Sequence, residues 1–364
     1  MTSRRNFLSG AATSLGGLSF CTCSLLTSAH AQSNARQRKP PVVAGKRVRT
    51  IDMHAHCYFN EALALAPGGP KAVLPPVKGV PEHFIVIKER LAAMDAMSID
   101  MQVLSINPFW YGLPRELAVE IVRIQNEKLA ELCALEPKRL GAFASLSLQF
   151  PELAVEQLEL AMKKQGLRGA AIGGSVAGTD FSDPKFHPVW AKAQELGAVL
   201  FIHPQSTPEL AKRFKGNGWL SNTIGNPLDT TIALQHLIFE GTLDKFPNLK
   251  ILAAHGGGYF GSYAPRSDVS CSVSPQNCDP SIVLKKKPSE YLKQIYVDSL
   301  VLTPEALRHL VAEAGASQVV IGTDQPIPWQ EYPVEHILET PDLSDADRIA
   351  IFSGNAIRLM GIAP

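Results

Sequence analysis

The sequence has almost no excess of charge of either sign, because 35 lysine and arginine residues oppose 34 aspartate and glutamate residues, for a formal net charge of +1. It also has no dense run of basic residues. The electrostatic footprint of a protein that binds nucleic acid or an anionic membrane is therefore absent. We expect neither nucleic acid nor a membrane anchor as a partner, and a small-molecule substrate instead.

Cysteine is scarce as well, with six residues in a chain of 364. Two of them, Cys21 and Cys23, fall within the first 31 residues. A chain of this length, 45% of it hydrophobic, can bury a large core without a disulfide scaffold. Cys271 and Cys278 lie in one segment rich in proline and serine, and the sequence alone leaves open whether they pair.

The first 31 residues have the order of an export signal. Ser3-Arg4-Arg5-Asn6-Phe7-Leu8 is followed by a weakly apolar stretch and then by Ala29-His30-Ala31, a small-residue cleavage site. We predict a twin-arginine signal peptide at residues 1–31 and a periplasmic location for the mature protein. The alternative is a basic amphipathic N-terminus that stays attached.

The rest of the chain alternates between two periodicities. Residues 32–48 are polar and basic, which indicates a linker, and ordered structure is expected from about Arg49. Beyond it, short apolar runs alternate with segments of helical period, which favours a parallel sheet built from βα units. The predicted strands are Thr50–His54, Met101–Ile106, Gly141–Leu146, Gly169–Ile172, Ala198–His203, Leu249–His255, Gln294–Asp298 and Gln318–Asp324. The predicted helices are Ile85–Met97, Arg115–Leu135, Pro151–Gln165, Pro188–Leu196, Asp229–Glu240, Pro304–Ala314 and Asp345–Met360.

Eight strands, each followed by a helical segment, predict an α/β fold of one domain, a TIM (β/α)8 barrel over residues 49–364. The alternative is a doubly wound open sheet. That fold is expected to carry a glycine-rich first turn, which this sequence lacks.

Polar residues gather at the predicted strand ends, where a TIM barrel builds its active site. The first strand ends in His54-Ala55-His56, and residues two apart share a face, so both imidazoles can face one ion. Later strands end in His203, His255 and Asp324. Three imidazoles and a carboxylate suit a divalent ion such as zinc. We predict that His54, His56, His203 and Asp324 bind one divalent metal ion.

Two further features bear on the site. Asp52 and Asp298 also lie near strand ends, and we interpret them as groups that support the ligands or the structure. The fourth strand end, Gly169–Gly173, carries no lysine, which argues against a binuclear site with a carboxylated lysine and for a mononuclear one. A binding or scaffold protein that had lost catalysis would lack one of the five strand-end groups, and none is missing.

Four motifs in order resemble the amidohydrolase-related family that includes aminocarboxymuconate semialdehyde decarboxylase; they are Ile51–His56, Phe201–Pro204, Ala254–Gly258 and Ile321–Pro326. The likeness runs from about Ile51 to the C-terminus. It implies a metal-dependent hydrolase-like barrel that decarboxylates a small unsaturated or aromatic carboxylic acid, with zinc, or alternatively manganese, as its cofactor. In the family pattern His255 is the acid/base. The alternative is a metal-dependent hydrolase or hydratase acting on a lactone, an amide or a ring-cleavage product.

The resemblance also implies a second subunit. Arg266 lies eleven residues after His255, where the family has an arginine that grips a substrate carboxylate across a homodimer interface. The alternative is a solvated loop arginine. The sequence departs from the pattern at Gln205, where the family decarboxylase has tryptophan, and the Pro75–His83 loop lacks a second arginine, for which Lys78 substitutes only loosely. We therefore expect a substrate with a different second anchor.

Aromatic residues follow the second and fifth predicted strands, on the side of the expected site. Phe109, Trp110, Tyr111 and Trp219 are predicted to wall an aromatic or conjugated substrate. Ordinary packing in the core is the alternative for each of them.

Overall fold

The barrel strands follow the sequence prediction. The computed structural model describes residues 38–77, 87–205 and 207–363. In this part of the chain all eight predicted strands are present, and they pair in parallel. They are β3 (Ile51–His56), β4 (Met101–Ser105), β5 (Leu140–Ala142), β6 (Gly169–Ile172), β7 (Val199–Ile202), β8 (Lys250–Ala253), β9 (Ile295–Asp298) and β10 (Val319–Val320).

Two seams close these strands into a barrel. The ladders run in the orders β3-β4-β5 and β10-β9-β8-β7-β6. Parallel bridges join β3 to the segment after β10, where Met53 N donates to Ile321 O at 2.9 Å. At the other seam Ala144 N donates to Gly169 O at 2.8 Å. The predicted TIM barrel is confirmed, and an open doubly wound sheet is excluded because both edges are paired.

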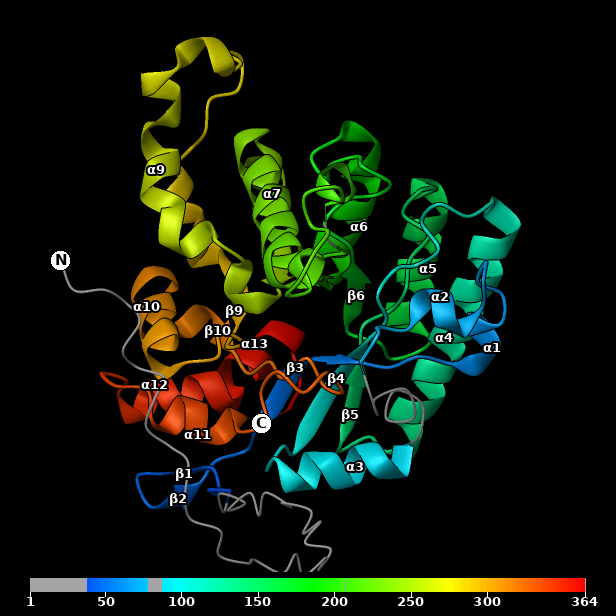
Figure 1. The fold of residues 1–364 in the computed structure, drawn as a ribbon, viewed down its shortest axis with the longest axis vertical. Coiled ribbons are helices and arrows are strands. Elements are labelled where there is room, and N and C mark those ends of the chain that lie inside the picture. The colour runs from blue at the N-terminus through cyan, green and yellow to red at the C-terminus, as the bar shows by residue number, and fades with distance from the viewer. Residues whose placement is uncertain (1–37, 78–86, 206, 364) are drawn as a thin grey trace, which may run out of the picture. The chain divides into compact units, whose positions relative to one another are not determined.

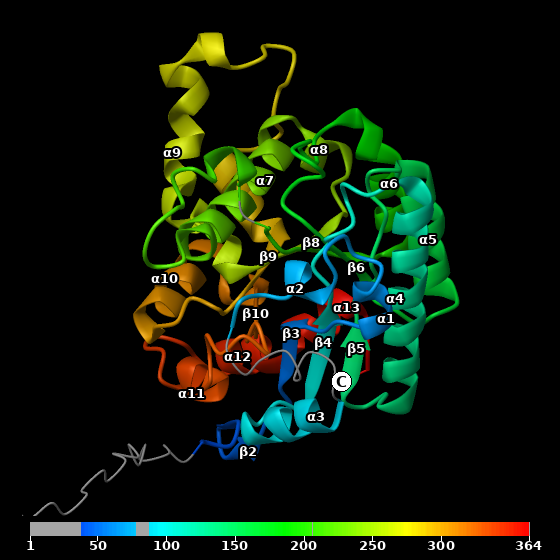
Figure 2. The ribbon, with the colours of Figure 1, turned by 45° about the vertical axis from the view of Figure 1, so that its right-hand side comes forward.

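A ring of helices lies outside the strands (Figure 1, Figure 2). The helices that follow the strands are α3 (Ile87–Ala96), α4 (Arg115–Leu135), α5 (Pro151–Lys163), α6 (His187–Leu196), α7 (Asn226–Phe239), α9 (Phe260–Val273), α10 (Pro304–Ala314) and α13 (Asn355–Met360). Shorter helices are α1 (Asn60–Leu63), α2 (Pro70–Val73), α8 (Thr242–Lys245), α11 (Pro333–Leu338) and α12 (Asp345–Ile349). The single C-terminal helix predicted over Asp345–Met360 is interrupted by a π-helical turn between α12 and α13. None of the helices described combines the length and the apolar character that crossing a membrane requires.

The barrel interior is a packed core. Alternate strand residues such as Met101, Val103 and Phe201 form one buried cluster, as expected when side chains of a strand alternate between two faces. Leu359 and Met360 of α13 belong to the same cluster, so the C-terminal helix packs onto the barrel interior. Hydrophobic packing therefore fills the barrel beneath the polar strand ends.

The N-terminal part of the prediction has a mixed outcome. The predicted signal peptide at residues 1–31 lies outside the described residues. The predicted linker differs from the structure where it is described, because β1 (Val42–Val43) and β2 (Lys46–Arg47) form an antiparallel hairpin. Val43 is 4% exposed and joins the hydrophobic core, so structure begins before Arg49. A two-residue turn, Ala44-Gly45, with both residues at positive φ explains the hairpin.

Helix α9 is absent from the sequence prediction. Its sequence contains Gly261, Pro265 and several serines, which have low helix propensity. Tertiary contacts stabilise it instead, because the Asp268 carboxylate accepts hydrogen bonds from Ser289 N and Ser289 Oγ at 2.8 and 2.7 Å. Together α9 and the segment that follows it extend away from the strands as an arm (Figure 1, Figure 2).

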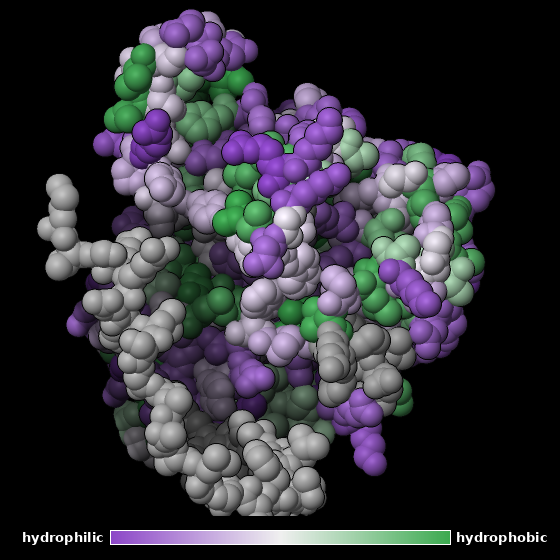
Figure 3. Space-filling view, viewed as in Figure 1, coloured by the Kyte–Doolittle hydropathy of each residue, from purple (hydrophilic) through white to green (hydrophobic). Residues whose placement is uncertain are grey.

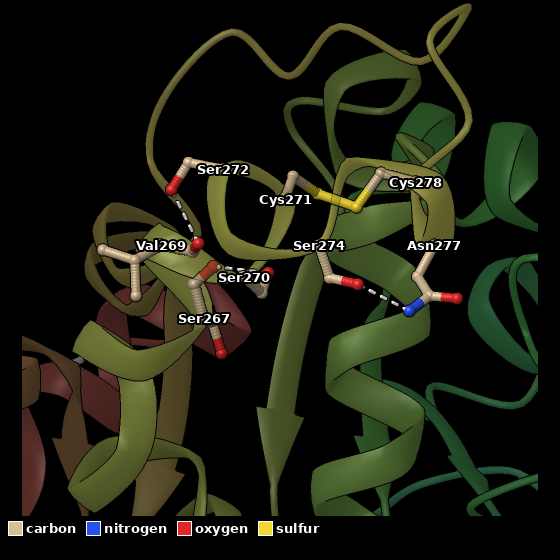
Figure 4. Close-up of a disulfide and its surroundings, with 8 residues drawn as sticks. All are labelled: Ser267, Val269, Ser270, Cys271, Ser272, Ser274, Asn277 and Cys278. Atoms are coloured by element: carbon tan, nitrogen blue, oxygen red, sulfur yellow. Dashed lines mark hydrogen bonds between the residues drawn. A yellow bond between two sulfur atoms is a disulfide. The ribbon is translucent and has the colours of Figure 1, made fainter.

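A disulfide closes the outer end of this arm. Cys271 in the last turn of α9 is bonded to Cys278, seven residues later (Figure 4). Within the loop so formed, Asn277 Nδ2 donates to Ser274 Oγ at 2.7 Å. The pairing that the sequence left open is therefore present, at the end of a helix and not in a loop.

Candidate metal centre and active site

Strand alternation delivers the predicted metal ligands to one point. Phe201 belongs to the barrel interior, and two residues further along the same face is His203, directly after β7. Residues two apart along an extended chain share a face, so His203 reaches the barrel mouth. Asp324 comes four residues after Val320, the last residue of β10, and reaches the same point through a left-handed backbone conformation, at φ 59°.

The first strand needs a bulge to do the same. Ile51 and Met53 face the interior, and strict alternation would then turn His54 outward. The pairing of β3 with β4 shifts register between Asp52 and Ala55, so β3 contains one extra residue there. A bulge of this kind re-aims the side chains that follow it. His54 and His56 consequently both face inward, as the sequence predicts, although simple alternation alone is not the reason.

The four predicted ligands lie together and are buried. One ligand atom of each of His54, His56, His203 and Asp324 lies within 4.8 Å of all the others. His56 Nε2 is 2.8 Å from Asp324 Oδ1 and 3.2 Å from His203 Nε2. His54 Nε2 is 3.2 Å from both His56 Nε2 and Asp324 Oδ1. Three imidazole nitrogens and one carboxylate oxygen therefore converge on a single small volume.

The hydrogen bonds behind the rings show that this donor set fits a cation. His54 Nδ1 is 2.6 Å from the carboxylate of Asp298, so Nδ1 carries the proton and donates it. Ser105 Oγ donates to Ala55 O and therefore accepts from His56 Nδ1 at 3.0 Å. In both neutral rings the lone pair then lies on Nε2. Facing lone pairs beside a carboxylate repel one another unless a positive charge lies between them, which is the arrangement of a metal site.

Asp298 and Asp52 support the ligand strands, in line with their interpretation from the sequence. The Asp298 carboxylate accepts from His54 Nδ1, from His255 N and Gly256 N at 3.0 Å each, and from Leu300 N at 3.0 Å. Gly322 leaves the space for it, because a Cβ there would lie 2.6 Å from that of Asp298.

Asp52 forms a corresponding bridge across the seam between the first and last strands. Its carboxylate accepts from His54 N at 3.1 Å and from Thr323 Oγ1 at 2.6 Å. Gln102 Nε2 on β4 donates to it at 2.8 Å, and the Gln102 carbonyl oxygen accepts from the buried Arg90 guanidinium at 2.7 Å. The other guanidinium nitrogen of Arg90 donates to the carbonyl oxygen of His56. The backbone that carries both histidines is thus bound on both sides.

The electrostatics of the cluster favour a cation. Burial would lower the pKa of His54, but Asp324 and Asp298 together raise it to about 10. Burial and the neighbouring imidazoles hold the pKa of His203 well below its ordinary value, so that ring is neutral and able to act as a ligand. Burial opposes ionisation of Asp324, yet the imidazoles around it, His54 foremost, hold its pKa well below the usual range. The two carboxylates require positive charge at this point, which a proton or a metal ion can supply.

His255 lies beside this cluster. It begins a short turn, His255–Gly257, two residues after β8, and its Nε2 is 3.9 Å from Asp324 Oδ2. Its side chain is 15% exposed and its Nδ1 has no hydrogen-bond partner among the described residues. The ring centroid is 5.2 Å from those of both His54 and His203. His255 is therefore adjacent to the metal centre and accessible from outside it, the position of a group that exchanges protons with a substrate.

A cavity of about 280 Å³ opens over the cluster, and His56, His203 and Asp324 form part of its wall. The remaining wall is uncharged. Its polar part comprises Tyr58, Asn107, Gln205, Ser221, Asn222 and Asn226, and its apolar part comprises Val73, Pro75, Phe109, Pro204, Trp219 and Ile327. A chamber of this size with amides, a hydroxyl and aromatic rings suits a small planar organic molecule.

The predicted aromatic wall is half right. Phe109 and Trp219 line the cavity. Trp110 does not, because it is fully buried and its Nε1 donates to Leu146 O at 2.8 Å. Tyr111 is also buried in the core and lines neither this cavity nor its neighbour. Packing accounts for the two that were misassigned.

Arg266 is not brought to the site within one chain. It lies on an exposed face of α9 and lines neither cavity near the metal centre. Gln205 does line the cavity, and its Nε2 donates to Pro108 O at 2.7 Å. Lys78 lies outside the described residues.

Several wall residues have no counterpart in the sequence prediction. Tyr58 and Asn107 come two residues after the ends of β3 and β4, so the strand-end rule that selected the metal ligands also selects them. Ser221 and Asn222 lie in a π-helical turn before α7, and Asn226 is the first residue of α7. No signal in the sequence indicated that these three side chains line the cavity.

Comparison with protein families gives one match over nearly the whole barrel. The model described as Amidohydrolase matches residues 51–362. Among characterised proteins, the chain is 32% identical over 279 residues to 2-amino-3-carboxymuconate-6-semialdehyde decarboxylase of Dictyostelium discoideum, covering 76% of each chain. It is 29% identical over 282 residues to gamma-resorcylate decarboxylase of a Rhizobium species, covering 74% of this chain and 85% of the relative.

Solved structures agree with this result. A dihydroxybenzoic acid decarboxylase from a Polaromonas species, with bound manganese and the inhibitor 2-nitroresorcinol, superposes with a TM-score of 0.77 at 26% identity. That match covers 86% of this chain and 97% of the other. For the fold alone, 5-carboxyvanillate decarboxylase from Sphingomonas paucimobilis gives a TM-score of 0.79 at 24% identity, over 87% of this chain and all of the other.

Proposed function

The chain belongs to the amidohydrolase family, and on that premise we propose that it is a metal-dependent decarboxylase of a small aromatic carboxylic acid. The observation that carries the proposal is the convergence of three imidazole nitrogens and the Asp324 carboxylate at the base of a cavity, with His255 beside them. The relatives support the reaction type, since they are decarboxylases of aromatic acids or of aminocarboxymuconate semialdehyde.

The residues divide the work of this reaction as follows. His54, His56, His203 and Asp324 would hold the ion. When bound, a divalent ion supplies the Lewis acidity that orients a carboxylate or acidifies a water molecule. His255 would hold a proton at Nε2 and deliver it to the ring carbon from which carbon dioxide departs. A C–H bond would then replace the bond between that carbon and the carboxylate group. The buried walls exclude water from that carbon.

The walls favour a monocarboxylic aromatic acid. Among the described residues that line the cavity within one chain there is no lysine or arginine to pair with a second carboxylate, so only the Arg266 that we propose below for the partner subunit would do so. Amides such as Asn107 and Asn222 instead donate and accept hydrogen bonds, which suits phenolic hydroxyl groups. Phe109 and Trp219 offer flat apolar surfaces for a ring. A hydroxybenzoic acid therefore fits this cavity better than an acyclic dicarboxylic acid does.

The metal is part of the same proposal. Three imidazoles and one carboxylate form a set that zinc prefers, and zinc is our first choice. The Polaromonas structure contains manganese, which is the alternative. Stripping the protein with a chelator and reloading it with either ion, followed by activity measurements, distinguishes the two.

We also propose a homodimer in which Arg266 reaches the partner's site. The arm that carries Arg266 exposes Tyr263, Val269 and Val273 at 62%, 50% and 77%. Figure 3 shows hydrophobic patches among hydrophilic ones on this arm. A mixing experiment is decisive, because R266A and H255A subunits should each be inactive alone, whereas a mixed dimer restores one complete site. Mixtures that stay inactive although they exchange subunits would show that Arg266 does not act in the partner's site.

Export remains a proposal as well. The disulfide between Cys271 and Cys278 suits an oxidising compartment such as the periplasm, and it supports the twin-arginine signal predicted at residues 1–31. Fractionation of cells that express the full chain, compared with a variant in which Arg4 and Arg5 are replaced by lysine, tests it. Retention of the variant in the cytoplasm is the expected result.

The first test of the reaction itself uses mass spectrometry. Metal-loaded protein is incubated with hydroxybenzoic acids, unsaturated acids, lactones and amides. Release of carbon dioxide from an aromatic acid is the expected outcome. Gain of water or cleavage of an acyl bond, with no loss of carbon dioxide from any acid, would replace the proposal by a hydrolase or hydratase.

A further inference from the structure

A second cavity, of about 310 Å³, lies next to the one over the metal ligands. The two share Asn222 and Asn226 in their walls. His255 lines the second cavity, whereas His56, His203 and Asp324 line the first. Since His255 Nε2 is only 3.9 Å from Asp324 Oδ2, both cavities reach the same reaction centre.

The walls of the second cavity have a different chemistry. Most are apolar: Pro227, Tyr259, Leu300, Val301, Leu302 and Trp329. No lysine, arginine, aspartate or glutamate is among the described residues that line it. A charged or hydroxylated group of a ligand would contribute little binding free energy there, whereas a hydrocarbon group would contribute favourably by leaving water.

Two tryptophans mark the boundary between the cavities. Trp219 lines the first and Trp329 the second, and their rings are stacked with centroids 6.0 Å apart and planes 19° apart. A molecule that extends from one cavity into the other would therefore lie beside this pair and beside the shared asparagines.

Backbone conformation supplies an independent sign of function. Of the eight non-glycine residues with positive φ in the described chain, four border these cavities: Trp219, His255, Leu302 and Asp324. Left-handed conformations are unfavourable for residues with a side chain, and they occur in tight turns, as at Ala44, and at sites that bind or react. Leu302, at φ 67° and 50% exposed, is the centre of a tight turn in which Thr303 N donates to Val301 O at 2.9 Å. Half of these unfavourable conformations therefore lie around the two cavities, which supports a common role for them.

We propose that the second cavity binds an apolar alkyl or aryl substituent of the aromatic acid whose carboxylate lies at the metal centre. The proposal rests on the function proposed above and narrows it to substituted acids. It makes Leu302 and Trp329 residues that determine substrate specificity. A bare hydroxybenzoic acid would fill the first cavity only.

The test is a series of 2-hydroxybenzoic acids that carry a methyl, propyl or pentyl chain at each free ring position in turn. For each acid the dissociation constant from the metal-loaded protein is measured by calorimetry, and carbon dioxide release is measured separately. At one ring position or more, the dissociation constant should fall about fourfold for each methylene group added, which is the gain from moving one methylene from water to an apolar wall. The gain should stop when the cavity is full.

A pair of variants locates the effect. L302W places a large ring in the second cavity. In this variant the dissociation constant should hardly change as methylene groups are added. L135W adds the same ring at the exposed end of α4, where Leu135 is 74% exposed, and should keep the wild-type gain. L302S, which removes apolar contact without adding bulk, should lower the gain as well and covers the case in which L302W fails to fold.

Three outcomes separate the two proposals. A chain-length dependence that L302W abolishes supports the second cavity as the binding site. No dependence at any ring position, or the same dependence in L302W as in L135W, would overturn this assignment even if carbon dioxide is released. A dependence on chain length without carbon dioxide from any acid would leave the binding site standing and remove the proposed decarboxylation.

Discussion

The two sides of the active-site cavity are built differently. On the metal side, His54 and His56 are held by buried hydrogen bonds to Asp298 and Ser105, and the backbone beneath them is fixed by Asp52. On the opposite side, the walls come from the segment between β7 and α7, from the start of α7 and from residues after β9 and β10, with uncharged amides and stacked tryptophans. The first side is fixed by strand geometry and the second by loops.

This difference teaches which properties can vary independently. Changes on the metal side are expected to alter whether an ion is bound at all, because His54 and His56 are oriented by the hydrogen bonds behind them. Changes on the loop side are expected to alter which acid is bound, because those residues line the cavities and are not metal ligands. Four substitutions test this separation.

The largest effect is expected from His203→Ala. Removal of one of four ligands from a buried site should abolish stable metal retention and with it activity. Metal content after gel filtration, measured by plasma mass spectrometry, checks this. His309→Ala, which removes an exposed imidazole on α10, is the control and should keep the wild-type metal content. Full metal occupancy in the His203 variant would break the assignment of the ligands.

His255→Asn should keep the metal and lose turnover by roughly two or more orders of magnitude, because no group remains to deliver the proton. Asparagine is chosen because His255 has a φ of 56°, a conformation that asparagine adopts more readily than alanine. Turnover at the wild-type rate with normal metal content would contradict the role of His255. His255→Ala should give the same loss.

Asp298→Asn is expected to weaken metal binding by about 10- to 100-fold, because His54 loses the carboxylate that orients its ring. Competition with a chromophoric chelator measures the affinity. Asp268→Asn is the control, since Asp268 is also a hydrogen-bonded carboxylate, accepting from Ser289 N and Oγ, but lies on the α9 arm. An equal loss in both variants would indicate a general loss of stability and not a specific effect on His54.

The smallest effect on the chemistry is expected from Asp229→Asn on the loop side. Burial raises the pKa of Asp229 to about 6, so the folded protein holds a proton that the unfolded chain releases between about pH 4 and 6. The free energy of unfolding therefore falls as the pH rises through that window. The variant should remove this dependence and be more stable at pH 7 by roughly 1–3 kcal/mol.

Urea denaturation between pH 4.5 and 7.5 measures this contribution. Asparagine can still accept the hydrogen bond from Gln205 N, which is 3.0 Å from Asp229 Oδ2 in the native protein. Metal content should not change. An unaltered pH profile in the variant would show that the carboxyl of Asp229 is not the group that titrates.

The metal side could be predicted from the sequence, whereas most of the loop side could not. All the metal ligands lie on or just after strands, where apolar runs and even spacing identify both the strand and the face. The bulge at β3 was not predictable from that pattern. The prediction that His54 and His56 share a face still holds, because the bulge shifts both residues together and they remain two apart. Tyr58 and Asn107 were within reach of the same rule.

Loop-borne features escaped prediction for physical reasons. Asn222 lies in a turn without periodicity and Asn226 at the first residue of α7, and their place in the wall depends on tertiary packing. Helix α9 contains Gly261 and Pro265 and is stabilised by contacts with distant residues such as Ser289, which local propensity does not register. Trp110 and Phe109 are neighbours in sequence, yet only one of them faces the cavity.

The seam between β3 and β10 has a consequence for biosynthesis. Asp52 and Thr323, whose side chains are hydrogen-bonded there, are 271 residues apart in the sequence. The metal ligands lie on both sides of the same seam, so a ribosome must synthesise the chain as far as Asp324 before all four ligands can surround one ion. Stable metal capture during biosynthesis therefore follows closure of the barrel at this seam.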